Sequence, residues 1–215
     1  MDRRQILRLI AAAGLAPAMI QQALGKGKLP LLAGFQKITG QVLINDKAAV
    51  EGQLVNPGDR VVTGANSEAT YVIGHDAFLQ RASSEVRFPM DAAGFFRVVS
   101  GKLLSVFGKG EKRLILPTAT IGIRGTGCYI ETDAMKSYFC LCYGEAEVVP
   151  SAAPKEREVI RTQHHDHPIY IHGDPAMPTS MVPATVINHT DAELTLLENM
   201  VGRWPPFYGQ DFKPY

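Results

Sequence analysis

Short runs in which apolar and polar residues alternate fill most of the chain from residue 37 onward, and this period of two predicts β-strands. Gly, Asn, Asp or Pro separates the runs at intervals of about 8–12 residues, which is typical of an all-β sandwich, barrel or β-roll. The expected strands are 37–44, 60–63, 69–74, 77–81, 84–88, 95–99, 102–107, 112–116, 128–132 and 137–143. The expected core residues are Val61, Tyr71, Phe78, Val86, Phe96, Val98, Leu104, Val106, Leu114 and Leu116.

One helix is predicted near the C-terminus, over residues 190–202. Thr190 supplies an N-cap, and Glu193, three residues later, completes a capping box. An apolar stripe at helical spacing predicts that the helix packs against the β-domain. The stripe consists of Leu194, Leu197 and Val201.

The N-terminus has the pattern of an export signal. Arg3 and Arg4 stand before a modest apolar run at 9–20, and small residues follow. The paired arginines resemble a twin-arginine signal, which predicts export to the periplasm. The run is too short and too rich in Ala and Gly for a membrane span, which needs about 20 strongly apolar residues. Residues 1–25 are therefore expected to be a signal segment, with an uncleaved N-terminal anchor as the alternative.

Composition narrows the classes of function. The 215-residue chain has a net charge of +1, and its charged residues are interspersed, so no surface for nucleic acid is indicated. No second apolar run approaches membrane length, so no span is expected once the signal is removed. The sequence lacks a Gly-rich phosphate loop, a nucleophile-elbow serine and the metalloprotease HExxH motif, and it is therefore not expected to be an enzyme.

Two cysteines and a cluster of histidines are the candidate chemistry. Cys140 and Cys142 lie two residues apart on a predicted strand, so both sulfurs share one face, with Cα atoms about 7 Å apart. This spacing suits two ligands of one metal ion better than it suits a disulfide. About 20 residues further on, the chain supplies His164, His165 and His167. Two thiols with two of these imidazoles predict a four-ligand site for zinc, copper or iron.

Simpler interpretations of these residues stay open. Cys140 and Cys142 can be small buried residues, because free cysteine packs like an apolar side chain, and an exposed histidine cluster needs no metal. His172 and His189 are weaker ligand candidates, since His189 directly precedes the helix cap and a backbone contact is its alternative role. Cys128 is a core thiol, a third ligand or a disulfide partner, and the length of the turn between its strand and the next decides which side it faces.

Several spaced segments together resemble the FecR domain. They are GQV at 40–42, LVNPGDRVVTG at 54–64, SEA at 67–69, FRVVSGKL at 96–103, TATIGIRGT at 118–126 and YGEAEV at 143–148. The resemblance implies a FecR-like β-sandwich or β-roll over residues 37–149 with a periplasmic address. It also favours the core-thiol interpretation of Cys128, because the equivalent position in the family is usually apolar. Within the fifth segment, Arg124, Gly125 and Thr126 are interpreted as a structural turn, since glycine supplies backbone conformations that other residues avoid.

The best-known FecR-domain proteins are periplasmic parts of iron-siderophore signalling, which pass a signal from an outer-membrane transporter to a cytoplasmic sigma factor. In this chain the apolar run begins at Leu9, after a region only as long as the start of a signal. A His-rich segment and a helix stand where a transporter-contacting region is expected. The resemblance therefore implies the fold, the address and a protein partner in the cell envelope, but not sigma-factor signalling.

Three parts are therefore expected: the signal at 1–25, the FecR-like β-domain at 37–149, and a His-rich loop, helix and aromatic tail at 150–215 that pack on it. The expected function is an exported metal-binding module for sensing or interaction. One alternative is a small periplasmic redox or electron-transfer metalloprotein that uses the Cys/His site. The other is a structural domain with a disulfide and no metal.

Overall fold

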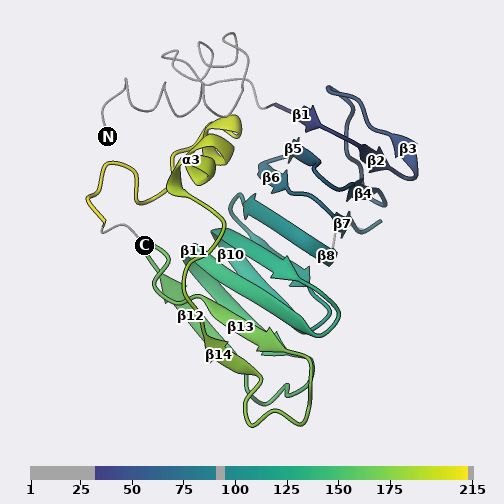
Figure 1. The fold of residues 1–215 in the computed structure, drawn as a ribbon. Helices are drawn as coiled ribbons and strands as arrows, with labels where there is room; N and C mark the ends of the chain where they lie inside the picture. Colours follow the sequence, from purple (N-terminus) through teal and green to yellow (C-terminus); the bar gives the residue numbers. More distant parts are fainter. Residues whose placement is uncertain (1–31, 91–94, 213–215) are drawn as a thin grey trace.

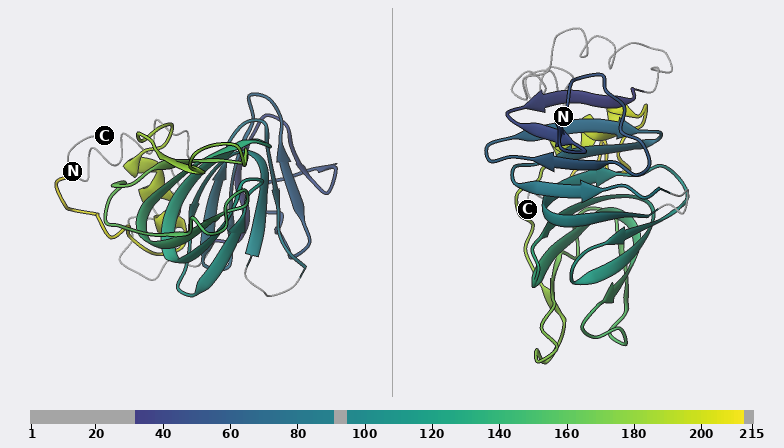
Figure 2. Two further views of the ribbon diagram at one scale, coloured as in Figure 1. Left: turned by 90° about the horizontal axis from the view of Figure 1, so that it is seen from below. Right: turned by 90° about the vertical axis from the view of Figure 1, so that its right-hand side faces the viewer.

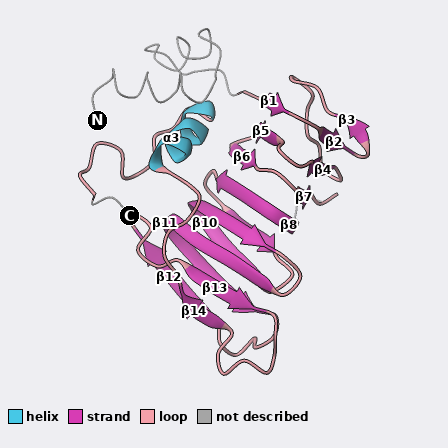
Figure 3. Ribbon diagram, in the orientation of Figure 1, coloured by secondary structure: helices cyan, strands magenta, loops and turns pink. Residues whose placement is uncertain are grey.

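The computed structural model describes residues 32–90 and 95–212, and the expected signal at 1–25 lies outside these residues. The described chain is mostly β-structure with one helix, α3 (Asp191–Met200), so the all-β prediction is confirmed (Figure 3). No helix in the described ranges is long and apolar enough to cross a membrane. The strands are β1 (Gly34–Thr39), β2 (Val42–Ile44), β3 (Lys47–Ala48), β4 (Arg60–Thr63), β5 (Glu68–Ile73), β6 (Asp76–Gln80), β7 (Ser84–Arg87), β8 (Phe95–Val106), β9 (Glu111–Ile115), β10 (Ala119–Thr132), β11 (Lys136–Pro150), β12 (Glu158–Thr162), β13 (Ile169–His172) and β14 (Met181–Pro183).

The strands form one continuous sheet that folds over into two layers (Figures 1 and 2). The first layer has the order β1-β5-β6-β8-β10-β11-β13-β14, and the second has the order β3-β2-β4-β7-β8-β9-β10-β11-β12. Three long strands, β8, β10 and β11, belong to both layers: one half of each pairs in the first layer and the other half in the second. All strand pairs are antiparallel except β8 with β9.

A glycine with a positive φ lies at the bend of each long strand. Gly101 in β8 has φ +91°, Gly125 in β10 has φ +55°, and Gly144 in β11 has φ +99°. Side chains other than glycine rarely adopt this region, so glycine allows the strands to bend without breaking. The strands expected at 95–99 and 102–107 are consequently one strand, β8.

The segment Arg124–Gly125–Thr126 is a β-bulge within β10 rather than a turn between strands, because the register with β11 shifts between Arg124 and Gly127. Arg124 forms an exposed ion pair with Glu111 on β9. This segment therefore bends a long strand, with Arg124 and Gly125 exposed and Thr126 buried.

The space between the layers holds an aromatic and aliphatic core. Phe78 on β6 contacts Phe96 in the second-layer half of β8, with ring centroids 5.6 Å apart, and Tyr71 on β5 contacts Phe88 at 6.0 Å. All ten expected core residues are buried. Leu104 and Val106 belong to a second apolar cluster on the outer face of the first layer, because side chains alternate along β8.

Helix α3 covers this outer face across β6 and β8 (Figure 1). Leu194 and Leu197 are fully buried there. The predicted capping box is present, with Thr190 as N-cap and Glu193 contacting it reciprocally. Arg81, at the end of β6, donates to the Glu193 carboxylate at 2.6 Å. The start of α3 is thereby fixed both by its own cap and by the sheet.

Residues 151–183, where a His-rich loop was expected, contribute three strands. β12 and β13 pair with the two halves of β11, and β14 follows at the edge. Ile160, Ile169 and Ile171 from these strands are buried in the core between the layers. The strands have only three to five residues each, too few to establish an alternation amid the prolines and histidines around them.

Candidate metal centre

β11 carries both candidate sulfurs on the outer face of the first layer, beneath the segment that leads into α3. Cys140 and Cys142 are fully buried in the outer cluster, whereas Leu141 between them points into the core between the layers. Cys128 on β10 lies opposite Leu141 in the register and shares its side of the sheet. The three cysteines are free. Cys128 therefore neither pairs with Cys140 nor joins the candidate site.

The loop between β12 and β13 folds back over this face. Its turn is held by Asp166, whose carboxylate accepts a hydrogen bond from the Thr162 hydroxyl at 2.6 Å and another from the Gln163 backbone N–H at 3.2 Å. His165 has a positive φ of +54°, and its backbone N–H donates to the Cys142 carbonyl at 3.1 Å. This left-handed backbone brings the His165 ring over the sulfurs.

His189 reaches the same place from the segment before α3. Its Nδ1 lies 2.7 Å from the Ile187 carbonyl, which can only accept, so Nδ1 carries the proton and Nε2 faces the cluster with its lone pair. The ring stacks on Tyr129 with centroids 4.7 Å apart. The sequence suggested a backbone contact for His189, and its Nδ1 makes one with Ile187. Its Nε2 remains available as a metal ligand.

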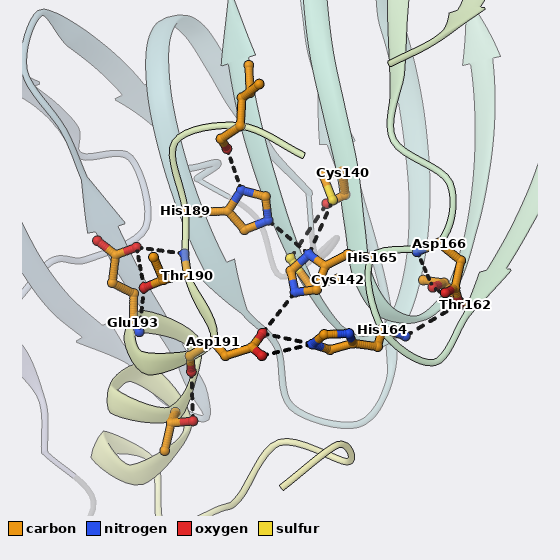
Figure 4. Close-up of polar contacts among 12 residues, drawn as sticks. Cys140, Cys142, Thr162, His164, His165, Asp166, His189, Thr190, Asp191 and Glu193 are labelled. Carbon is orange, nitrogen blue, oxygen red and sulfur yellow. Dashed lines mark hydrogen bonds and ion pairs between the residues drawn. The ribbon is translucent and has the colours of Figure 1, made fainter. Parts of the chain in front are cut away.

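Four donor atoms converge on one point (Figure 4). His165 Nδ1 lies 3.5 Å from Cys140 Sγ and 3.0 Å from His189 Nε2. With Cys142 Sγ, all four atoms lie within 4.8 Å of one another, and all four residues are buried. Around one tetrahedral ion with metal–sulfur bonds of about 2.3 Å and metal–nitrogen bonds of about 2.0 Å, ligand atoms lie roughly 3.3–3.8 Å apart. The separations of 3.5 and 3.0 Å are close to these values, and the 4.8 Å limit brings all four atoms near enough to share one ion after small side-chain movements.

Asp191, the first residue of α3, faces two histidines. Its carboxylate oxygens lie 3.0 and 2.9 Å from His164 Nε2, and one of them lies 3.2 Å from His165 Nε2. His165 therefore stands between two groups, with Nδ1 toward the sulfurs and Nε2 toward Asp191 (Figure 4). A carboxylate in the first turn of a helix is also favoured by the helix dipole.

These contacts alter the acidity of the cluster. The hydrogen bond from Cys142 lowers the pKa of Cys140 to about 3, and His165 and His189 add to this effect against burial. Burial would lower the pKa of His165, but the contacts with Asp191 and Cys140 outweigh it and raise that pKa to about 9. Burial also raises the pKa of Cys142. The lowered pKa of Cys140 favours its thiolate, the form that binds metal.

The other expected ligands lie elsewhere. His167 Nε2 lies 3.0 Å from a Glu158 carboxylate oxygen, with both side chains about half exposed, so it does not join the sulfurs. His164 contacts Asp191 rather than a cysteine. Of the three imidazoles expected from the sequence, the structure brings His165 to the sulfurs and supplies His189 in place of a second one. The signal for His189 was its position directly before the cap of a helix expected to dock on the β-domain.

No family model and no curated protein sequence matches this chain. Among solved structures, it is similar to two crystal structures of a candidate anti-sigma factor from Parabacteroides distasonis, at 1.65 and 2.50 Å resolution. Their TM-scores are 0.48 and 0.47, with sequence identities of 8% and 9%. In each case 59% of this chain matches 59% of the other, so the chain spans about three fifths of the length of these structures.

Proposed function

We propose that this protein is an exported β-roll of the cell envelope that binds one buried transition-metal ion and acts as a sensing or interaction module. The observation that carries the proposal is the convergence of four donor atoms from three segments: Cys140 and Cys142 on β11, His165 on the following loop, and His189 before α3. Such a set binds metal only when the three segments are folded together. Metal binding and the position of α3 are therefore linked.

The kind of donor atoms favours zinc. Two thiolates and two imidazoles in a tetrahedral arrangement form a closed zinc site, in which protein ligands fill every position. The N–H of the second ring nitrogen of His189 donates to a backbone carbonyl, and the second ring nitrogen of His165 contacts a carboxylate. Histidines that bind metal usually make such a contact through their other nitrogen. A closed site leaves no position for a substrate, so it supports a binding function rather than catalysis at this ion.

The resemblance to the FecR domain supports a sensing or interaction role, and the twin-arginine-like start supports export. The alternative of a redox metalloprotein needs the same ligands with copper or iron instead of zinc. The alternative of a disulfide-bonded domain is disfavoured by Cys128, which faces the opposite side of the hairpin from the other two cysteines.

Metal analysis of the protein isolated from the periplasm tests the proposal. The native protein should carry a tightly held, colourless zinc ion, and Cys142→Ser should lose it because one thiolate is gone. Cys128→Ala is the matched control, since it removes a buried thiol from the same hairpin on the other face, and it should retain the ion. Visible absorption from copper or iron would favour the redox alternative. A metal-free native protein, or equal metal in both variants, would contradict the proposal.

Export can be tested separately. Replacing both Arg3 and Arg4 with lysine should leave a longer precursor in the cytoplasmic fraction, because the twin-arginine route reads the paired arginines. Immunoblotting of cell fractions measures this. Periplasmic delivery at the native level in the double variant would show that another route, or an N-terminal anchor, is used.

A further inference from the structure

We propose a second metal site next to the first, formed by His164 Nε2, His165 Nε2 and the Asp191 carboxylate, so that the His165 ring bridges two ions. The proposal rests on the proposed function, because His165 is a ligand in both sites. The three donor groups lie within 4.8 Å of one another. Imidazole nitrogens and a carboxylate form a borderline-to-hard donor set without sulfur, which suits zinc, cobalt, nickel or copper in the divalent state.

The positions of the two histidines support a site of their own. A ligating His165 needs only one partner on its second nitrogen, and Asp191 supplies that partner. His164 is a second, buried imidazole aimed at the same carboxylate, and it reaches both oxygens at 2.9–3.0 Å. Consecutive residues usually point apart. Here the positive φ of His165 turns both side chains toward Asp191, and a non-glycine residue in this region carries a conformational cost.

The second site differs from the first in its access to solvent. The side chains of His164 and His165 are 5% and 1% exposed, but that of Asp191 is 43% exposed. Three protein donors leave at least one coordination position open, whereas four donors close the first site. An ion here can therefore take a water molecule, a small anion or a side chain of a protein partner as an additional ligand. The exposed edge at the start of α3 becomes the part of the site that a partner can reach.

His164 and His165 each hold a proton on Nε2 when they donate to Asp191, and each releases it to solvent when a metal takes its place. The proton that His165 Nδ1 donates to His189 Nε2 is likewise released to solvent when the first ion binds. His165 then has a metal on both nitrogens and is an imidazolate. The ion on Nδ1 favours this loss, because a bound cation makes the rest of the ring more acidic. The two ions then share the His165 ring as a bridge.

Cobalt(II) added to the metal-free full-length protein distinguishes the two sites. The first equivalent should produce an intense thiolate-to-cobalt charge-transfer band from the two cysteines. A second equivalent should bind with ligand-field absorption only, because the second site has no sulfur. In His164→Ala the first band should remain and the second equivalent should be lost, so that one of two ions disappears. The retained charge-transfer band also shows that this variant is folded.

Two further variants complete the test. Asp191→Asn should also lose the second equivalent, whereas His167→Ala, which removes a histidine of the same loop outside both sites, should bind two ions like the native protein. One equivalent in the native protein, with its charge-transfer band, would overturn the second site and leave Asp191 as an outer partner of a single ion. Two equivalents in His164→Ala would place the second ion elsewhere and overturn it as well. A native protein without the charge-transfer band would instead overturn the first site, and with it the bridge through His165.

Discussion

Removing the proposed metal ion should loosen helix α3 on the sheet while the β-roll stays folded. His189 and Asp191 flank the N-cap of α3, and both contact His165, which in turn contacts Cys140. Without an ion, this part of the structure depends on weaker hydrogen bonds. A ligand present at 100 times its dissociation constant stabilises the form that binds it by about 2.7 kcal/mol. Amide hydrogens of α3 should then exchange roughly 100-fold faster after metal removal, provided that opening of the helix requires loss of the ion.

Hydrogen exchange with and without a chelator measures this effect. The pair of β2 and β4 is the internal reference, because it belongs to the second layer and contributes no ligand. Cys142→Ser should show fast exchange in α3 whether or not chelator is added. Equal protection of α3 in the metal-bound and metal-free native protein would show that the helix is held by its apolar contacts alone, through Leu194 and Leu197.

Gly101→Ala should prevent the β-roll from folding. At φ +91°, an added Cβ would lie 2.2 Å from the Ser84 Oγ and 2.4 Å from the Ser84 Cα. The second of these atoms is backbone, so the bend of β8 or its pairing with β7 must shift. We expect a loss of more than about 4 kcal/mol in the free energy of unfolding, which is at the upper end for single substitutions. Urea unfolding, or the yield of soluble protein if none folds, measures the loss.

Gly52→Ala is the matched control. This glycine also has a positive φ, +83°, but an added Cβ would meet nothing within 4 Å. Its substitution should lower the free energy of unfolding only by the cost of placing alanine in a left-handed conformation, about 1–2 kcal/mol. If Gly101→Ala and Gly52→Ala cost the same, the close approach at the bend of β8 is relieved by small movements and does not limit the fold.

The sequence predicts second-layer strands such as β4 and β7 well because one face of each is buried, and this produces a period of two. The same rule places Cys140 and Cys142 on one face. The glycines mislead, because a glycine within an apolar run looks like a break: Gly101 divides one bent strand into two expected ones. Only the pairing of distant segments shows that the chain continues through the bend.

The histidines of the site are harder to predict than the cysteines. His165 and His189 lie 24 positions apart and meet only because the loop after β12 and the segment before α3 converge on the same strand. His165 was singled out by its place in a histidine cluster, but the same argument selected His167, which is paired with Glu158 at the surface. A pattern of ligand types can identify the candidates, whereas the path of the loop decides which of them reaches the sulfurs.

The strands shared between the layers also bear on how the protein folds. β8, β10 and β11 each run through both layers, so the central strands of one layer are covalently continuous with those of the other. Neither layer can complete its pairing until these strands have bent, and many of the contacts join residues far apart in the sequence. Such a topology folds slowly relative to helical proteins of similar size. It also leaves no boundary along which one half of the roll could unfold while the other half persists.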